Sequence, residues 1–99
     1  MDRLTPAEEQ VMLRLWKLEN TSVKDIVALY SEPRPAYNTI STIVRILEKK
    51  GYIKHKAKGR GFTYSPKISK DKYKMYLCNY LLDNYFDGNV NEYNSVFKS

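Results

Sequence analysis

The segment over residues 36–66 constrains the fold more than any other part of this 99-residue chain. Apolar side chains recur at three- and four-residue steps after Ala36, which predicts an amphipathic helix, and Gly51 provides its C-terminal stop. Strand-forming residues and two glycines follow at once and predict a short basic β-hairpin. The strands are predicted over residues 52–57 and 62–66, with the tip at residues 58–61. The chain must therefore pack a helix next to a cationic hairpin.

Two helices are predicted before this segment. The first begins after Thr5, which can cap it, and Glu8 completes a capping box. The second begins at Ser22 and is expected to end near Ser31, because prolines at 33 and 35 cannot continue it. Both have apolar residues spaced for one buried face.

After the hairpin, a tyrosine-rich helix is predicted from about residue 69 to residue 86, and a further helix is predicted after Val90. The element order is then α-α-α-β-β-α. This order predicts a mainly α (α+β) fold, a winged helix-turn-helix with a C-terminal dimerisation helix. We expect a DNA-binding domain at residues 1–68 and a helical dimerisation region at residues 69–99.

Charge is concentrated in the first part of the chain. The net charge is +6, and residues 1–70 hold 14 basic and 7 acidic side chains. Residues 45–60 contain seven basic residues and one acid, Glu48. This distribution favours binding to a polyanion, although a Lys-rich surface can also be no more than a solvated face.

The sequence contains no motif for catalysis or metal binding. One cysteine, Cys78, and one histidine, His55, provide neither a metal-ligand set nor a nucleophile–base pair. We expect Cys78 to be a small core residue and His55 to be a surface histidine without partners. No apolar run is long enough to span a membrane, and no signal peptide is evident. We therefore predict a cytoplasmic protein that is not an enzyme, with no cofactor, no metal and no small-molecule substrate.

The outer face of the helix that ends before Gly51 has the amide, hydroxyl and cationic side chains that pair with base edges and phosphates. Arginine can bind guanine and asparagine can bind adenine in a bidentate manner. The alternative for Ser22 is simple helix capping. The predicted DNA-binding residues are Asn38, Thr39, Ser41, Thr42, Arg45 and Lys49 on this helix, Lys54, Lys56, Lys58 and Arg60 on the hairpin, and Ser22 and Lys24 at the start of the second helix.

The tyrosine-rich helix is predicted to join two copies of the chain. Tyrosine suits interfaces because it combines an apolar ring with a polar tip, and paired reading helices would match a two-fold symmetric site. The alternative is a helix that folds back on its own core. The predicted dimerisation residues are Tyr73, Tyr76, Leu77, Tyr80, Leu81 and Tyr85.

Several segments taken together resemble the penicillinase-repressor family (BlaI/MecI/CopY), over about residues 3–97. They are residues 4–12 with Leu15 and Trp16, residues 22–27, 37–43 and 47–53, the hairpin tip and residues 62–66. The resemblance implies a homodimeric winged-helix repressor that binds double-stranded DNA at a palindromic promoter operator. It also implies relief of repression through a membrane sensor metalloprotease pathway that leads to cleavage in the C-terminal region.

This chain departs from the family pattern at several points. Ala36 stands where relatives often have a capping serine, and Ile46 replaces a frequent arginine. The cysteine pattern of the copper-responsive branch is absent, which argues against copper sensing. The Asn-Phe cleavage site of antibiotic-type relatives is also absent, and the cleavage region is expected at Val96 and Phe97. Relatives continue into more helix, so dimerisation is expected to be weaker here.

The sequence thus predicts a sequence-specific DNA-binding transcriptional repressor. The alternative is a winged-helix protein-interaction module without specific DNA binding, although such a module would not need a cationic helix and hairpin. RNA binding is disfavoured, because no aromatic platform for base stacking is evident on the predicted strands.

Overall fold

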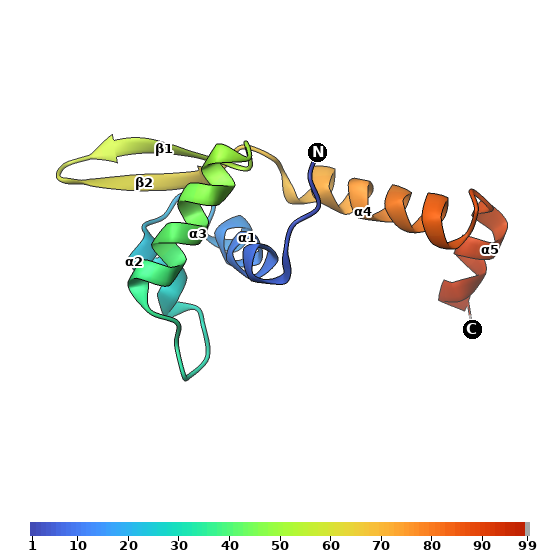
Figure 1. Ribbon diagram of the computed structural model, residues 1–99, viewed down its shortest axis with the longest axis horizontal. Helices are drawn as coiled ribbons and strands as arrows, with labels where there is room; N and C mark the ends of the chain where they lie inside the picture. The colour runs from blue at the N-terminus through green and yellow to red at the C-terminus, as the bar shows by residue number, and fades with distance from the viewer. Residues whose placement is uncertain (99) are drawn as a thin grey trace. The chain divides into compact units, whose positions relative to one another are not determined.

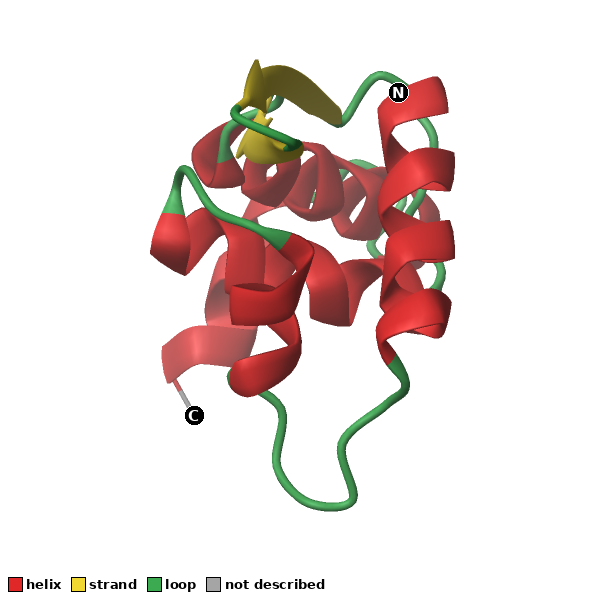
Figure 2. Cartoon of the chain, turned by 90° about the vertical axis from the view of Figure 1, so that its left-hand side faces the viewer, coloured by secondary structure: helices red, strands yellow, loops and turns green. Residues whose placement is uncertain are grey.

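The computed structural model describes residues 1–98 and divides them into two compact units that meet after Ser69. Helices dominate both units, and the strands form one antiparallel hairpin (Figure 2). The predicted winged helix, mainly helical with a two-stranded wing, is confirmed. The elements are α1 (Pro6–Leu18), α2 (Val23–Ala28), α3 (Tyr37–Lys49), β1 (Ile53–Lys58), β2 (Gly61–Pro66), α4 (Lys70–Tyr85), α5 (Val90–Ser95) and the 3-10 helix η1 (Val96–Lys98) (Figure 1).

The core of the first unit lies between the apolar faces of its three helices. The helices and the start of β1 contribute buried side chains that include Val11, Met12 and Leu15 from α1, Val23 and Ile26 from α2, Ile40, Val44 and Leu47 from α3, and Ile53. The capping box predicted at the start of α1 is present, with the Thr5 side chain accepting from the Glu8 N–H and the Glu8 carboxylate accepting from the Thr5 N–H. The capping box therefore places the start of α1 correctly, and the apolar periodicity places α3 correctly.

The end of α2 was predicted wrongly. The helix stops at Ala28 rather than near Ser31. The N–H groups of Leu29 and Tyr30 bond to carbonyls three residues back, those of Ile26 and Val27, at 3.1 and 3.0 Å. The chain tightens into a 3-10-type turn before the proline-containing loop, which shortens the α-helix.

The end of α3 determines how the wing begins. Gly51 has φ +87°, its N–H bonds to the Glu48 carbonyl, and the Tyr52 N–H bonds to the Leu47 carbonyl at 2.9 Å. These two bonds make a Schellman motif, which needs the left-handed backbone that glycine adopts most easily. The motif turns the chain directly into β1, so that α3 lies beside the hairpin (Figure 1).

The hairpin is joined to the helices by a short bridge. Thr21, just before α2, exchanges two backbone hydrogen bonds with Tyr64 of β2, at 2.9 and 2.7 Å. Thr21 is buried although it is polar, and these backbone bonds satisfy its peptide groups. The bridge fixes the wing against the turn that leads into α2.

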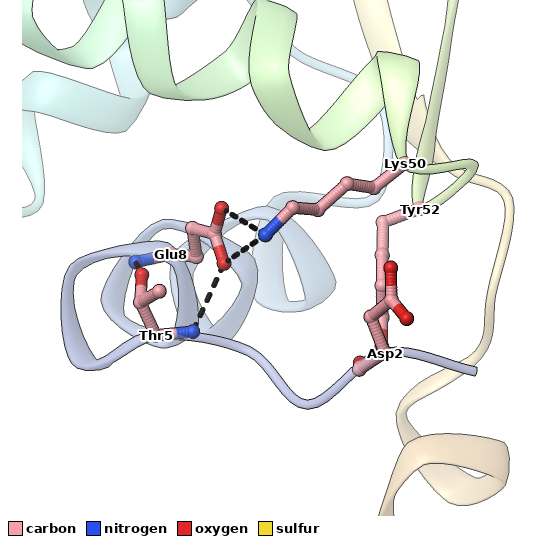
Figure 3. Close-up of polar contacts among 5 residues, drawn as sticks. All are labelled: Asp2, Thr5, Glu8, Lys50 and Tyr52. Atoms are coloured by element: carbon pink, nitrogen blue, oxygen red, sulfur yellow. Dashed lines mark hydrogen bonds and ion pairs between the residues drawn. The ribbon is translucent and has the colours of Figure 1, made fainter.

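A buried ion pair joins α1 to the end of α3 (Figure 3). Glu8 is 5% exposed, and its carboxylate lies 2.8 and 3.1 Å from the Lys50 ammonium. Burial acts to raise the pKa of Glu8, but the bonds from Lys50 and Thr5 outweigh it and hold the pKa below its ordinary value. The carboxylate thus remains ionised inside the unit because two donors satisfy it.

The second unit contains α4, α5 and η1. Within α4 only Tyr73 is buried. The rings of Phe86, Tyr93 and Phe97 make successive edge contacts, with centroids 5.3 and 5.5 Å apart. Asn89 caps α5 by accepting from the Glu92 N–H at 3.0 Å.

Candidate nucleic-acid interface

The helix α3 presents opposite faces to the core and to solvent. Ile40, Val44 and Leu47 are buried, whereas Asn38 and Thr42 are exposed. The Thr42 hydroxyl donates to the Asn38 carbonyl at 2.9 Å, and its oxygen can still accept a hydrogen bond. The outer face is therefore polar, as expected for a helix that contacts base edges.

A second stripe of α3 faces the wing. Tyr37, Ser41 and Arg45 follow one another at four-residue steps and so lie on one flank of the helix. Glu48, three residues beyond Arg45, continues this flank toward the hairpin. The flank therefore differs from the outermost face, which holds Thr42, and Asn38 lies between the two.

The register of the hairpin separates its side chains into two faces. His55 lies opposite Tyr64 and Ala57 opposite Phe62, so the rings share one face. The rings are in contact, with His55 and Phe62 centroids 5.1 Å apart. The alternating residues Lys54, Lys56 and Lys58 share the other face and are all exposed.

His55 is not the isolated surface residue that the sequence suggested. Its Nδ1 is paired with the Glu48 carboxylate of α3, and the Phe62 ring packs edge-on against it at an interplanar angle of 80°. The prediction of a histidine without partners was wrong, because Glu48 is seven residues away in sequence and only the Schellman turn brings the two together. The pair ties the ring-bearing face of the wing to α3.

A groove of about 420 Å³ lies between the start of α2, the flank of α3 and strand β2. Six of the predicted DNA-binding residues line it, namely Ser22, Lys24, Asn38, Ser41, Arg45 and Arg60. The other six are exposed outside its lining, with Thr39, Thr42 and Lys49 on α3 and Lys54, Lys56 and Lys58 on the lysine face of the wing. The predicted residues thus divide into a groove, an outer helix face and a lysine face.

Sequence reasoning missed three aromatic residues of the groove, Tyr37, Phe62 and Tyr64. Tyr37 and Phe62 are 56% and 51% exposed, so the wing does have an accessible aromatic ring, contrary to the expectation. The four-residue spacing from Tyr37 to Arg45, and a hairpin register drawn from the tip glycines, could have revealed them.

The pKa of Tyr64 is shifted by burial and by charged groups near this groove. Burial raises the pKa of Tyr64, and nearby Glu48 and Tyr37 raise it further against the opposing effect of Arg45. The phenol therefore stays protonated and can act as a hydrogen-bond donor.

The start of α2 uses its serine for capping. The Ser22 hydroxyl oxygen accepts from the Asp25 N–H at 3.2 Å, which confirms the capping alternative. Lys24 is exposed and adds a positive charge to the groove. Ser22 thus shapes one wall while Lys24 contributes charge.

An apolar groove of about 340 Å³ lies on the second unit and is lined by Leu81, Tyr85, Phe86, Tyr93, Val96 and Phe97. Two of the predicted dimerisation residues, Leu81 and Tyr85, therefore lie beside the aromatic cluster of α5 and η1. Tyr76 and Leu77 are half-buried, Tyr80 is exposed, and Tyr73 is 3% exposed. Tyr73 therefore has little surface left for a second copy.

Cys78 is also half-buried in this unit. A hydrogen bond with Cys78, together with burial, raises the pKa of Tyr93. Within residues 1–98 no group of acidic, cysteine and histidine side chains is arranged to hold a metal ion. No helix in the same range is long and apolar enough to cross a membrane.

Three helices, a wing and a cationic groove between them define a winged-helix DNA-binding protein. The family model for the penicillinase repressors (Penicillinase repressor) matches residues 4–98, and the chain belongs to this family. The members of the family are transcriptional repressors and not enzymes.

Individual relatives agree with this assignment. The chain is 28% identical over 90 residues to the penicillinase repressor of Bacillus licheniformis, covering 90% of this chain and 70% of that protein. It is 31% identical over 68 residues to an uncharacterised 16.5 kDa protein of Latilactobacillus sakei, covering 68% of this chain and 47% of the relative. The fold is similar, with a TM-score of 0.58 and 29% identity, to the solution structure of monomeric Bacillus licheniformis BlaI in complex with the blaP half-operator, over 73% of this chain and 89% of that one.

Proposed function

We propose that this protein is a sequence-specific repressor that binds a palindromic operator in double-stranded DNA as a homodimer. The observation that carries the proposal is the groove between α3 and the wing, where Arg45, Arg60 and Lys24 gather with hydroxyl and amide groups. Cations supply affinity through the phosphates, and the polar outer face of α3 supplies base contacts. The similarity to BlaI bound to a half-operator supports the same mode of docking.

Selection of bound duplexes from a random pool tests this function. We expect a two-fold symmetric motif with half-sites about one helical turn, ~34–36 Å, apart. Binding to that motif should weaken steeply with salt, by about 0.9 in log K per log salt for each phosphate contacted. If no motif is enriched and binding is insensitive to salt, the winged-helix interaction module replaces this proposal.

Homodimerisation is proposed to use the apolar groove of the second unit together with the exposed side of α4. Contiguous exposed apolar side chains mark interaction surfaces, and Tyr80, Leu81 and Tyr85 lie in this region. Sedimentation equilibrium should give twice the chain mass at micromolar concentration. A monomer at all concentrations, with the operator still bound cooperatively, would place the dimer contact elsewhere.

Relief of repression is proposed to follow cleavage near Val96 and Phe97 through a membrane sensor metalloprotease pathway, which requires a cytoplasmic repressor. Both side chains are exposed in η1, and Phe97 lines the apolar groove. Cleavage between them would remove Phe97 from this surface. Intact-mass spectrometry of the protein from cells treated with a β-lactam should show a product ending at Val96, and an unchanged mass during derepression would contradict this route.

A further inference from the structure

The groove between α3 and the wing contains two arginines on opposite walls. Arg45 comes from the flank of α3 and Arg60 from the hairpin next to the start of β2. Both side chains are exposed, and neither forms an ion pair with a carboxylate within residues 1–98. Two cations that face one groove without internal partners favour an anion from outside the protein.

The nearest acid on the same flank is already engaged. Glu48 lies three residues beyond Arg45, but its carboxylate is paired with His55 of β1. Glu48 is therefore paired with a residue other than the two arginines, and the His55 ring of this pair packs edge-on against Phe62, which lines the groove. The groove remains cationic although an acid stands next to it.

The position of Arg45 on the helix distinguishes base contact from phosphate contact. The side chains opposite the buried Ile40, Val44 and Leu47 are Thr42 and Lys49, and Asn38 lies between this outer face and the groove. Arg45 is turned toward the wing and lines the groove with Tyr37, Asn38 and Ser41, whereas Thr42 and Lys49 lie outside its lining. A helix in the major groove meets base edges with its outermost face, whereas its flanks meet the sugar–phosphate strands that border the groove.

We propose that the groove holds one sugar–phosphate strand of the operator, clamped between Arg45 and Arg60, so that Arg45 positions the protein rather than reading guanine. Donors suited to phosphate oxygens also line the groove, including Lys24, Ser41 and the protonated Tyr64. The exposed rings of Tyr37 and Phe62 offer apolar faces to the adjacent deoxyriboses. Base selection then rests on Thr42 of the outer face and on Asn38, which lies at the border between that face and the groove. This inference rests on the proposed function as a DNA-binding repressor.

The clamp is tested by replacing single phosphates of the selected operator with neutral methylphosphonates. For the wild-type protein, one or two adjacent positions in each half-site should lower affinity about tenfold. The same substitutions should have little effect on Arg45→Gln and Arg60→Gln, because the lost charge pair is already absent. The double variant should lower the slope of log K against log salt by about 1.8 per half-site, with the selected motif unchanged.

A matched arginine outside the groove provides the control. Arg34 is exposed but pairs with Glu32 at 2.6 Å, and Arg34→Gln should retain the wild-type methylphosphonate pattern. Thermal melting verifies that each variant is folded. If the wild type enriches no motif, the proposed function fails. If a motif is enriched but Arg45→Gln relaxes one base position and leaves the phosphate pattern intact, Arg45 reads a base and the clamp is wrong.

Discussion

The two units of this chain differ in how much of their apolar side-chain surface they bury. In the first unit α3 buries Ile40, Val44 and Leu47 to 2% exposure or less. In the second unit α4 buries only Tyr73, while Leu81 and Tyr85 are 41% and 68% exposed. Because burial of apolar surface is the main favourable term in folding, the first unit can stabilise its helices within one chain. The second unit has apolar surface left for a partner.

Two leucines provide the sharpest test of this difference. Leu47→Ala should destabilise the first unit by about 3 kcal/mol, because it leaves a cavity among buried side chains. Leu81→Ala should change the stability of the dilute monomer by less than about 0.5 kcal/mol. Urea denaturation at submicromolar concentration measures both. Equal losses would mean that Leu81 is as fully packed in one chain as Leu47.

The next prediction concerns association rather than folding. Leu81→Ser combined with Tyr85→Ser should abolish the dimer and weaken binding to the full operator by about 100-fold, since the two half-sites are no longer linked. Binding to an isolated half-site should not change. Sedimentation equilibrium and operator titration measure these effects.

Met75→Ser is the matched control for that variant. Met75 is exposed on the same helix but lies outside the lining of the apolar groove. It should retain the dimer. Loss of the dimer in this control would mean that the contact covers another side of α4.

The sequence could predict the elements whose signals are local. The apolar steps of α3, the stop at Gly51 and the capping box of Thr5 and Glu8 are properties of neighbouring residues, and each is present in the structure. The winged-helix fold follows from their order. The early end of α2 could not be predicted from the sequence, because it depends on a tightened last turn of the helix and not on the prolines alone.

The candidate interface was predictable by residue type but not by arrangement. The polar and cationic residues were identified, yet their division between groove, outer face and lysine face requires the hairpin register. The partners of His55 and Glu8 are seven and 42 residues away in sequence, so no local pattern reveals them. The partners of these side chains are therefore determined by tertiary contacts and not by local sequence.

The ion pair of Glu8 and Lys50 gives a further contrast between the units. The pKa of Glu8 is lowered in the folded protein. The ionised carboxylate therefore adds to the free energy of unfolding at pH values above the ordinary pKa of 4.5, and this stabilisation is lost as pH falls through the folded pKa. Glu8→Gln should lower stability by about 1–2 kcal/mol at pH 7. The deficit relative to wild type should shrink below pH 4.5.

Asp71→Asn is the matched change in the second unit. Asp71 pairs with Lys74 on the surface of α4, with side chains 86% and 65% exposed, and such pairs contribute less than about 1 kcal/mol. Urea denaturation from pH 3 to pH 7 compares the two variants. A pH-independent deficit for Glu8→Gln would mean that the carboxylate is not ionised in the folded unit.

The smallest predicted effect concerns the start of α3. The N-cap residues Thr5, Ser22 and Asn89 all accept a backbone N–H with their side chains, but Ala36 has no oxygen to do so. Ala36 nevertheless has the extended backbone of a cap, with φ −66° and ψ 147°, so a serine needs no rearrangement there.

Ala36→Ser should therefore stabilise the first unit by about 1 kcal/mol and raise its melting temperature by roughly 4–8 °C. Ala57→Ser, at an exposed position of β1, adds the same hydroxyl without a helix end to cap and should change the melting temperature little. If Ala36→Ser gives no increase, the first N–H groups of α3 are already satisfied by water. Packing of Ile40, Val44 and Leu47 alone would then determine the stability of this helix.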